Sequence, residues 1–205
     1  SYRFATISKD LEARLAEVKD LSEKNLHQER EARKQEVERR LLEADNARKT
    51  KELEEARQLQ LSMLPKQVPD LPGLIIDVYM ETAAEVGGDY YDFHVDDENT
   101  LTAVIGDATG HGMKAGTMVT AIKGIFGTYR ETDDFPGFFS RCSGIIKGMD
   151  LGNLYMAMMM LKIKGNRVTV SSAGMPPALI FRAGSQRVEE ILIKAPPLGG
   201  FTHFE

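Results

Sequence analysis

The sequence predicts an α+β protein in which a long coiled-coil helix precedes a domain of antiparallel sheet. The first observation is the distribution of glycine and proline, which disfavour a helix interior. Among these 205 residues, all 18 glycines are at Gly73 or later and all 8 prolines at Pro65 or later. The second is that nearly half of residues 1–60 are charged, with both signs mixed. We therefore divide the chain into a helical coiled-coil linker, residues 1–63, and a compact domain, residues 64–205.

The first predicted element is a helix from about residue 8 to residue 63. Its main residue types are Glu, Lys, Arg, Leu, Ala and Gln, which lose little rotamer freedom in a helix. Apolar residues form two stripes, within 11–21 and 37–56, separated by a polar stretch. Two such seams favour a parallel homodimeric coiled coil, and a solvated single helix held by ion pairs is the alternative. Pro65 ends the helix, because proline lacks the backbone donor that the next turn needs.

The domain that follows is predicted to place two helices between two groups of strands. The expected strands are 74–81, 90–95, 101–105, 154–163, 167–171, 178–182 and 188–193, and the expected helices are 113–129 and 135–149. A two-residue turn near Asn99 and a turn at Gly165-Asn166 would close hairpins. Strands, then helices, then strands is an order typical of antiparallel sheet rather than of a doubly wound fold.

Composition and charge exclude several functional classes. The net charge of −5 argues against general binding to nucleic acid, which needs a basic face. The lone cysteine, Cys142, excludes a disulfide scaffold and is typical of a reducing compartment. We find no apolar run near the roughly 18–20 residues of a membrane span, and no signal peptide at the start. We expect a cytoplasmic chain without direct membrane contact, and leave open a membrane-bound sensor as its parent protein.

Two glycine-rich turns, VGGDYYD around Asp89 and IGDATGHG around Asp107, form the candidate site. If the strands at 90–95 and 101–105 pair as a hairpin, the two aspartates lie at the same end. Neighbouring carboxylates repel unless a cation or a shared proton lies between them. Oxygen ligands without thiolates suit Mg²⁺ or Mn²⁺. The alternative is that these aspartates only cap turns, and for Asp92 the choice between a site role and a capping role stays open.

Four motifs in order, VGGDYYDF, IGDATGHGMKAG, SSAGMPPALIF and APPLG, resemble the PPM (protein phosphatase 2C-like) metal-dependent serine/threonine phosphatases of the bacterial SpoIIE/RsbU branch. The resemblance covers about residues 52–200 and includes the lead-in helix ELEEARQLQLSMLP. It implies a β-sandwich flanked by helices, with a two-metal Mg²⁺ or Mn²⁺ centre. The implied ligands are the carboxylates of Asp89 and Asp107, with Asp107 bridging both ions, and the backbone carbonyl of Ala108. The nucleophile would be a metal-activated water, so no protein nucleophile is expected.

The same resemblance implies a substrate and a mode of control. The substrate would be phosphoserine or phosphothreonine on a STAS-type anti-anti-sigma protein, and an upstream sensor domain would act through the linker helix. The family's later metal-binding aspartates follow the PPLG motif, whereas this chain ends at Glu205. We therefore expect this truncated chain to be weakly active or inactive and its parent to be a phosphatase. A catalytically degenerate module for dimerisation and phosphoprotein binding is the alternative.

Overall fold

The computed structural model describes residues 2–81, 86–150, 152–201 and 203–204. The chain divides into two compact units, Ser1–Lys51 and Glu52–Glu205. The helix α1 (Tyr2–Met63) makes up the first unit, and its last turns belong to the second. The helix ends two residues before Pro65, as predicted. The division into a linker of residues 1–63 and a domain of residues 64–205 stays a prediction.

In the first unit, α1 carries charged pairs one turn apart and apolar side chains that face solvent. Arg39, for example, pairs with Glu36 at 2.9 Å and with Glu43 one turn later. The large apolar side chains that are at least half exposed here are Leu11, Leu15, Val18, Leu21, Leu26, Val37, Leu41 and Leu42. A single chain therefore leaves the first predicted stripe and the Val37–Leu41 part of the second exposed to solvent, and the coiled-coil partner stays a prediction. Across the described parts of the chain, no helix combines the length and the apolar character that crossing a membrane requires.

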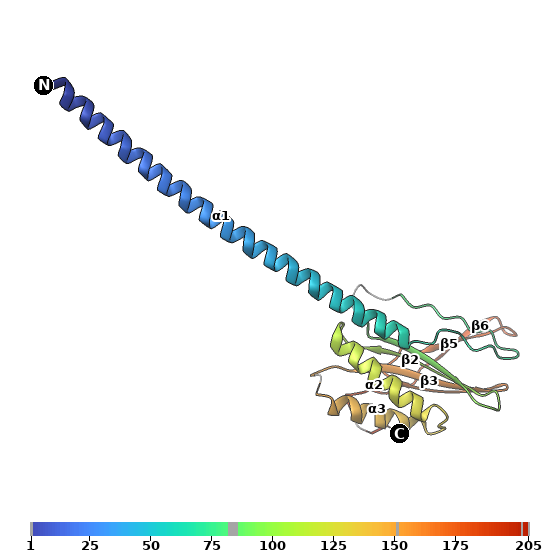
Figure 1. The fold of residues 1–205 in the computed structure, drawn as a ribbon. Helices are drawn as coiled ribbons and strands as arrows, with labels where there is room; N and C mark the ends of the chain where they lie inside the picture. The colour runs from blue at the N-terminus through green and yellow to red at the C-terminus, as the bar shows by residue number, and fades with distance from the viewer. Residues whose placement is uncertain (1, 82–85, 151, 202, 205) are drawn as a thin grey trace. The chain divides into compact units, whose positions relative to one another are not determined.

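The second unit contains two antiparallel sheets (Figure 1). The four-stranded sheet has the order β1-β2-β3-β4, and β5 and β6 form a separate hairpin. The strands are β1 (Asp89–Val95), β2 (Leu101–Ala108), β3 (Met156–Lys164), β4 (Arg167–Ala173), β5 (Ala178–Arg182) and β6 (Arg187–Ile191). The tight turn predicted at Gly165-Asn166 joins β3 to β4, with Gly165 at a positive φ of 56°. The predicted α+β class with antiparallel sheet is confirmed.

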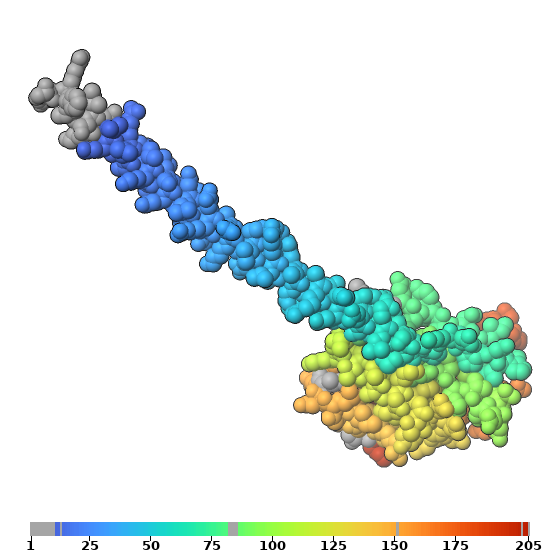
Figure 2. Space-filling view, in the orientation of Figure 1, coloured from blue at the N-terminus to red at the C-terminus, as the bar shows by residue number. Residues whose placement is uncertain are grey.

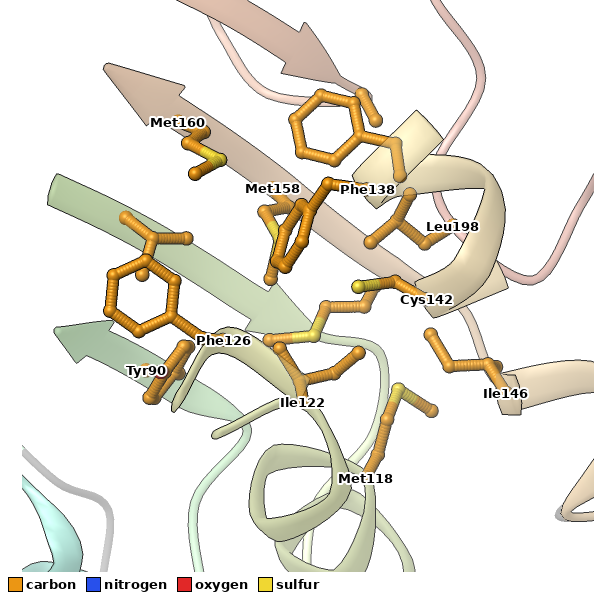
Figure 3. Packing of buried hydrophobic residues seen from close by; sticks show 14 of the residues in the cluster. Tyr90, Met118, Ile122, Phe126, Phe138, Cys142, Ile146, Met158, Met160 and Leu198 are labelled. Atoms are coloured by element: carbon orange, nitrogen blue, oxygen red, sulfur yellow. The ribbon is translucent and has the colours of Figure 1, made fainter. Parts of the chain in front are cut away.

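Two helices, α2 (Met113–Tyr129) and α3 (Phe135–Gly148), supply one side of the main core. Figure 3 shows their side chains meeting those of β3, among them Phe126 and Phe138, whose rings pack edge to face at 6.4 Å. Alternate methionines of β3, Met158 and Met160, are fully buried beneath them. Cys142 of α3 is also fully buried, and its thiol is free. The sheet face opposite these helices is the one that carries Asp89.

Two local predictions were wrong. Residues 74–81, all described, form no strand, although Leu74 and Ile76 pack against a second cluster around Leu101. The alternating pattern therefore reflects one packed face, since strand propensity measures packing rather than an intrinsic need for a ladder. The turn near Asn99 is also longer than predicted, because β1 and β2 pair only as far as Val95 and Leu101. Asn99 has a φ of 57° within this five-residue connection, 96–100.

Candidate metal centre

Asp89 and Asp107 lie directly opposite each other at the open end of the β1–β2 hairpin. The next pair outward is joined by a hydrogen bond, because Ala108 N–H donates to the Gly88 carbonyl at 3.0 Å. Hydrogen-bonded and non-hydrogen-bonded pairs alternate in an antiparallel ladder, so the two aspartates form a non-hydrogen-bonded pair, with Cα atoms typically about 4.5 Å apart. The prediction that both lie at one end of a hairpin is confirmed.

The electrostatics of this pair are unfavourable in the absence of a cation. Both aspartates reach solvent. Even so, the pKa of Asp89 is raised above its usual value, mainly because partial loss of hydration penalises its charge and further because Asp107 repels it. A nearby positive charge would favour both ionised forms. The ionised forms of this pair would therefore be stabilised by a cation, as expected of metal ligands. Aspartates that only cap turns need no such neighbour.

A third oxygen, the carbonyl of Ala108, lies against Gly88, the residue that precedes Asp89. A Cβ atom built on Gly88 would lie 2.4 Å from the Ala108 carbonyl oxygen, far inside van der Waals contact. Only glycine leaves this oxygen where it is. The hairpin thus pairs Asp89 with Asp107 and places the Ala108 carbonyl against the residue next to Asp89, and the role of all three as ligands stays a proposal.

Asp92, whose role the sequence left open, anchors β1 to the helical layer. Its carboxylate accepts hydrogen bonds from Lys123 of α2 at 2.7 Å and from the Tyr90 hydroxyl at 3.0 Å. Being an odd number of residues from Asp89, it points to the opposite face of the strand. Burial, followed by the charge of Asp92 and its hydrogen bond, raises the pKa of Tyr90, so the phenol stays a donor. Asp92 is thus a support for the strand and does not join the candidate ligands.

The turn that follows Asp107 is tied to the strand β3 through Thr109. The Thr109 N–H donates to the Tyr155 carbonyl at 2.8 Å, and the Tyr155 N–H donates to the Thr109 hydroxyl at 2.9 Å. This reciprocal pair fixes the chain just after Ala108. A support of this kind has no signal in the sequence, because Thr109 and Tyr155 are 46 positions apart.

The donor set fits a hard divalent cation. It contains two carboxylates and a carbonyl, and oxygen donors of this kind suit Mg²⁺ or Mn²⁺. Within residues 2–81, 86–150, 152–201 and 203–204, no three or more His, Cys, Asp or Glu side chains cluster closely enough to hold a metal. The described residues therefore offer part of a coordination shell around the Asp89–Asp107 pair.

Comparison with known proteins gives a family match and partial relatives. The family model for Stage II sporulation protein E (SpoIIE) matches residues 97–205. Protein IcfG of Synechocystis sp. is 41% identical over 64 residues, which is 31% of this chain and 10% of that protein. The chain thus spans about a tenth of the length of this curated relative.

Solved structures with a similar fold include one from Mycobacterium tuberculosis. The crystal structure of the RsbU and RsbW domains of Rv1364c matches with a TM-score of 0.50 at 21% identity, over 58% of this chain and 34% of that one. This likeness shows a shared fold. RsbX in complex with magnesium matches with a TM-score of 0.47 at 24% identity, over 57% of this chain and 56% of RsbX.

Proposed function

Because the chain belongs to the SpoIIE family of PPM-type phosphatases, we propose that it is the phosphatase module of a protein that dephosphorylates phosphoserine or phosphothreonine with Mg²⁺ or Mn²⁺. The observation that carries the proposal is the placement of Asp89 opposite Asp107, with the Ala108 carbonyl against the neighbouring Gly88. In the absence of a cation the pKa of Asp89 is raised, first by partial loss of hydration and then by the charge of Asp107. A site arranged in this way is suited to hold positive charge.

The chain's own residues would bind the cations and keep the ligands in register. Asp89, Asp107 and the Ala108 carbonyl would hold them, and the ladder of β1 and β2 fixes the separation of the two carboxylates. The Asp92–Lys123 pair ties β1 to α2 three residues after Asp89. When bound, a pair of such cations lowers the pKa of a water molecule and neutralises charge on the phosphoryl oxygens.

The proposal is tested by metal-dependent hydrolysis of a phosphoserine peptide. The assay compares this chain, the protein that its gene encodes in full, and that full protein carrying Asp107→Asn. We expect turnover with Mn²⁺ in the full protein, loss of turnover with EDTA, and loss in Asp107→Asn. Turnover that survives both EDTA and the substitution would contradict the proposal.

The finer part of the proposal concerns the substrate. We propose a phosphorylated STAS-type anti-anti-sigma protein, which is the substrate that the resemblance to the SpoIIE/RsbU branch implies. A panel of phosphorylated STAS-type proteins from the same genome would identify the substrate by its kcat/KM. Equal rates on all members and on an unrelated phosphopeptide would count against this choice.

Control through the linker helix is the third part of the proposal. The exposed apolar stripes of α1 support a homodimer through a parallel coiled coil, which would connect an upstream sensor domain to the phosphatase module. Sedimentation equilibrium of the chain measures the dimer directly. Cysteine cross-links that fix the helices in different registers should then give different phosphatase rates, and identical rates in every register would exclude control of this kind.

A second candidate function is a dimerisation and phosphoprotein-binding module without turnover. It is favoured by the absence of a third acidic ligand among the described residues. The two functions differ in one measurement on the full protein. Binding of a phosphorylated partner without any release of phosphate, at saturating Mn²⁺, would favour the binding module.

A further inference from the structure

The three residues before Asp89 are each held by a different partner. The Val86 carbonyl accepts the Gly112 N–H at 2.8 Å, and the Gly88 carbonyl accepts the Ala108 N–H at 3.0 Å. Both of these partners belong to the segment around Asp107. Gly87, between them, is held from the end of α1. The loop that positions Asp89 is thus fixed at consecutive residues.

Gln60 of α1 makes both contacts to Gly87. Its side-chain nitrogen donates to the Gly87 carbonyl at 2.7 Å, and its side-chain oxygen accepts the Gly87 N–H at 3.0 Å. The amide therefore pairs with both backbone groups of Gly87, as a residue of a neighbouring antiparallel strand would. Gln60 is only 7% exposed, so water cannot easily replace either bond. Among the twenty side chains, only Gln and Asn offer a donor and an acceptor in this planar arrangement.

The packing around this contact leaves little freedom for the loop. A Cβ atom on Gly116 of α2 would lie 2.3 Å from the Val86 side chain, so Val86 packs directly on the helix backbone. In the space-filling view, the last turns of α1, in teal, lie against the yellow-green surface of α2 (Figure 2). Ala56, Leu59, Gln60 and Met63 of α1 line the same depression as Val86 and Gly116. The end of α1 and the start of α2 therefore hold the loop from two sides.

We infer that Gln60 is a positioning residue for the metal centre. Its amide fixes Gly87, and thereby keeps Asp89 opposite Asp107 and the Ala108 carbonyl against Gly88. Gln60 touches neither the candidate ligands nor the reacting atoms. The inference rests on the proposed function, because it takes the Asp89–Asp107 pair to be metal ligands. It makes the last turns of the linker helix a part of the site.

The test replaces Gln60 by a side chain of similar length without the amide. In the full protein, Gln60→Met should weaken Mn²⁺ binding about tenfold, measured by calorimetry, since unpaired buried peptide groups let the loop depart from its position. The phosphatase rate should then show a raised KM for Mn²⁺ and a kcat within about twofold of the unchanged protein, because saturating metal restores the loop. A merely destabilised fold would lower kcat at every Mn²⁺ concentration.

The matched control is Gln58→Met, two residues earlier on the same helix. Gln58 is exposed and hydrogen-bonds within the helix to Glu54 at 2.7 Å. It should leave Mn²⁺ affinity unchanged. Equal affinities in Gln60→Met and Gln58→Met would overturn the inference.

Hydrogen exchange on the unsubstituted protein gives a readout that needs no variant. If Gln60 and the metal act on the same loop, Mn²⁺ binding must slow exchange of the Gly87 N–H, because coupling between sites is reciprocal. Unchanged exchange at Gly87 on metal binding would contradict the inference even if Gln60→Met fails to fold.

The two proposals fail in different ways. A protein that neither binds Mn²⁺ nor hydrolyses phosphopeptide would end the proposed function. The role of Gln60 is then decided by exchange at the Ala108 and Gly112 N–H groups. Faster exchange there in Gln60→Met, but not in Gln58→Met, would support positioning of the loop, and equal exchange would refute it.

Discussion

Asp89 and Asp107 are direct partners across the β1–β2 hairpin, and each carries the charge that the other repels. Like charges directly opposite in a sheet destabilise the pairing. The hairpin therefore carries an electrostatic cost at one end, next to a peptide carbonyl that only glycine accommodates. A substitution that removes this repulsion should therefore lower metal binding and turnover without lowering the stability of the fold. Both quantities can be measured.

Replacing Asp107 should abolish function without harming the fold. In Asp107→Asn, we expect phosphatase turnover of the full protein to fall by at least about 100-fold, because several kcal/mol of charge stabilisation by the cation are lost. Without metal, the midpoint of thermal unfolding should be unchanged or higher, since repulsion of Asp89 is removed. The control is Asp97→Asn in the exposed loop at the other end of the hairpin, which should change neither quantity.

A side chain at Gly88 should disturb the Ala108 carbonyl. Gly88→Ala places a Cβ atom 2.4 Å from that oxygen, so the backbone must move. We expect a loss of about 1–3 kcal/mol in the free energy of unfolding, as for other overpacked positions, together with weaker Mn²⁺ binding. Gly127→Ala in α2, where nothing lies within 4 Å, should instead stabilise the protein by roughly 0.5–1 kcal/mol. Denaturant titration of both variants compares them, and a neutral Gly88→Ala would refute the close approach.

The Asp92–Lys123 pair should contribute to stability and not to metal binding. Its side chains are 13% and 31% exposed, so breaking it leaves a poorly hydrated carboxylate. Lys123→Met should cost about 1–2 kcal/mol, less than the loss of a fully buried pair. The exposed Lys114→Met is the control and should be near neutral. A larger effect of Lys123→Met on Mn²⁺ affinity than on unfolding would place Asp92 in the metal site after all.

The thiol of Cys142 should be inert in the folded protein. Burial raises its pKa to about 12, so almost none of it is thiolate at pH 8. Iodoacetamide at pH 8 should therefore modify Cys142 only after denaturant is added. Labelling at the rate of a free thiol in native buffer would mean that the α3 core opens readily.

The Asp96 carboxylate should make the hairpin loop sensitive to acid. Hydrogen bonds from the Thr100 and Glu98 backbone N–H groups hold the pKa of Asp96 below its ordinary value of 3.8. The stabilisation is therefore present above that value and is lost as the pH falls toward the lower folded pKa. Asp96→Ala should remove this part of the pH dependence of unfolding below about pH 4. If the stability of Asp96→Ala depends on pH below about pH 4 as that of the unsubstituted protein does, the loop contributes nothing to this dependence.

Most of the second unit was predictable because its patterns are local. The helix α2 begins and ends at the predicted residues, Met113 and Tyr129. Asp89 and Asp107 could be placed at one end of a hairpin because a short connection fixes the register of two adjacent strands.

The supports of the site could not be predicted, because they join distant residues. Gln60 is one of many polar residues on α1, and only the fold shows that its amide meets Gly87. Lys123 looks like any solvated lysine until α2 lies over β1. The error at 74–81 has the same origin, since whether an alternating segment joins a ladder depends on neighbours that the local sequence does not specify.

The position of both aspartates within one hairpin has a consequence for the order of folding. Hairpins form within about 1–10 μs, and contacts close in sequence form before distant ones. The Gly87–Gln60 and Thr109–Tyr155 contacts span 27 and 46 residues. The repelling pair would therefore assemble early and by local pairing alone, and the distant contacts that hold its loops would arrive afterwards. A folding chain would therefore pass through a stage at which Asp89 and Asp107 are already paired, while the contacts of Gln60 and Tyr155 with the adjoining loops have not yet formed.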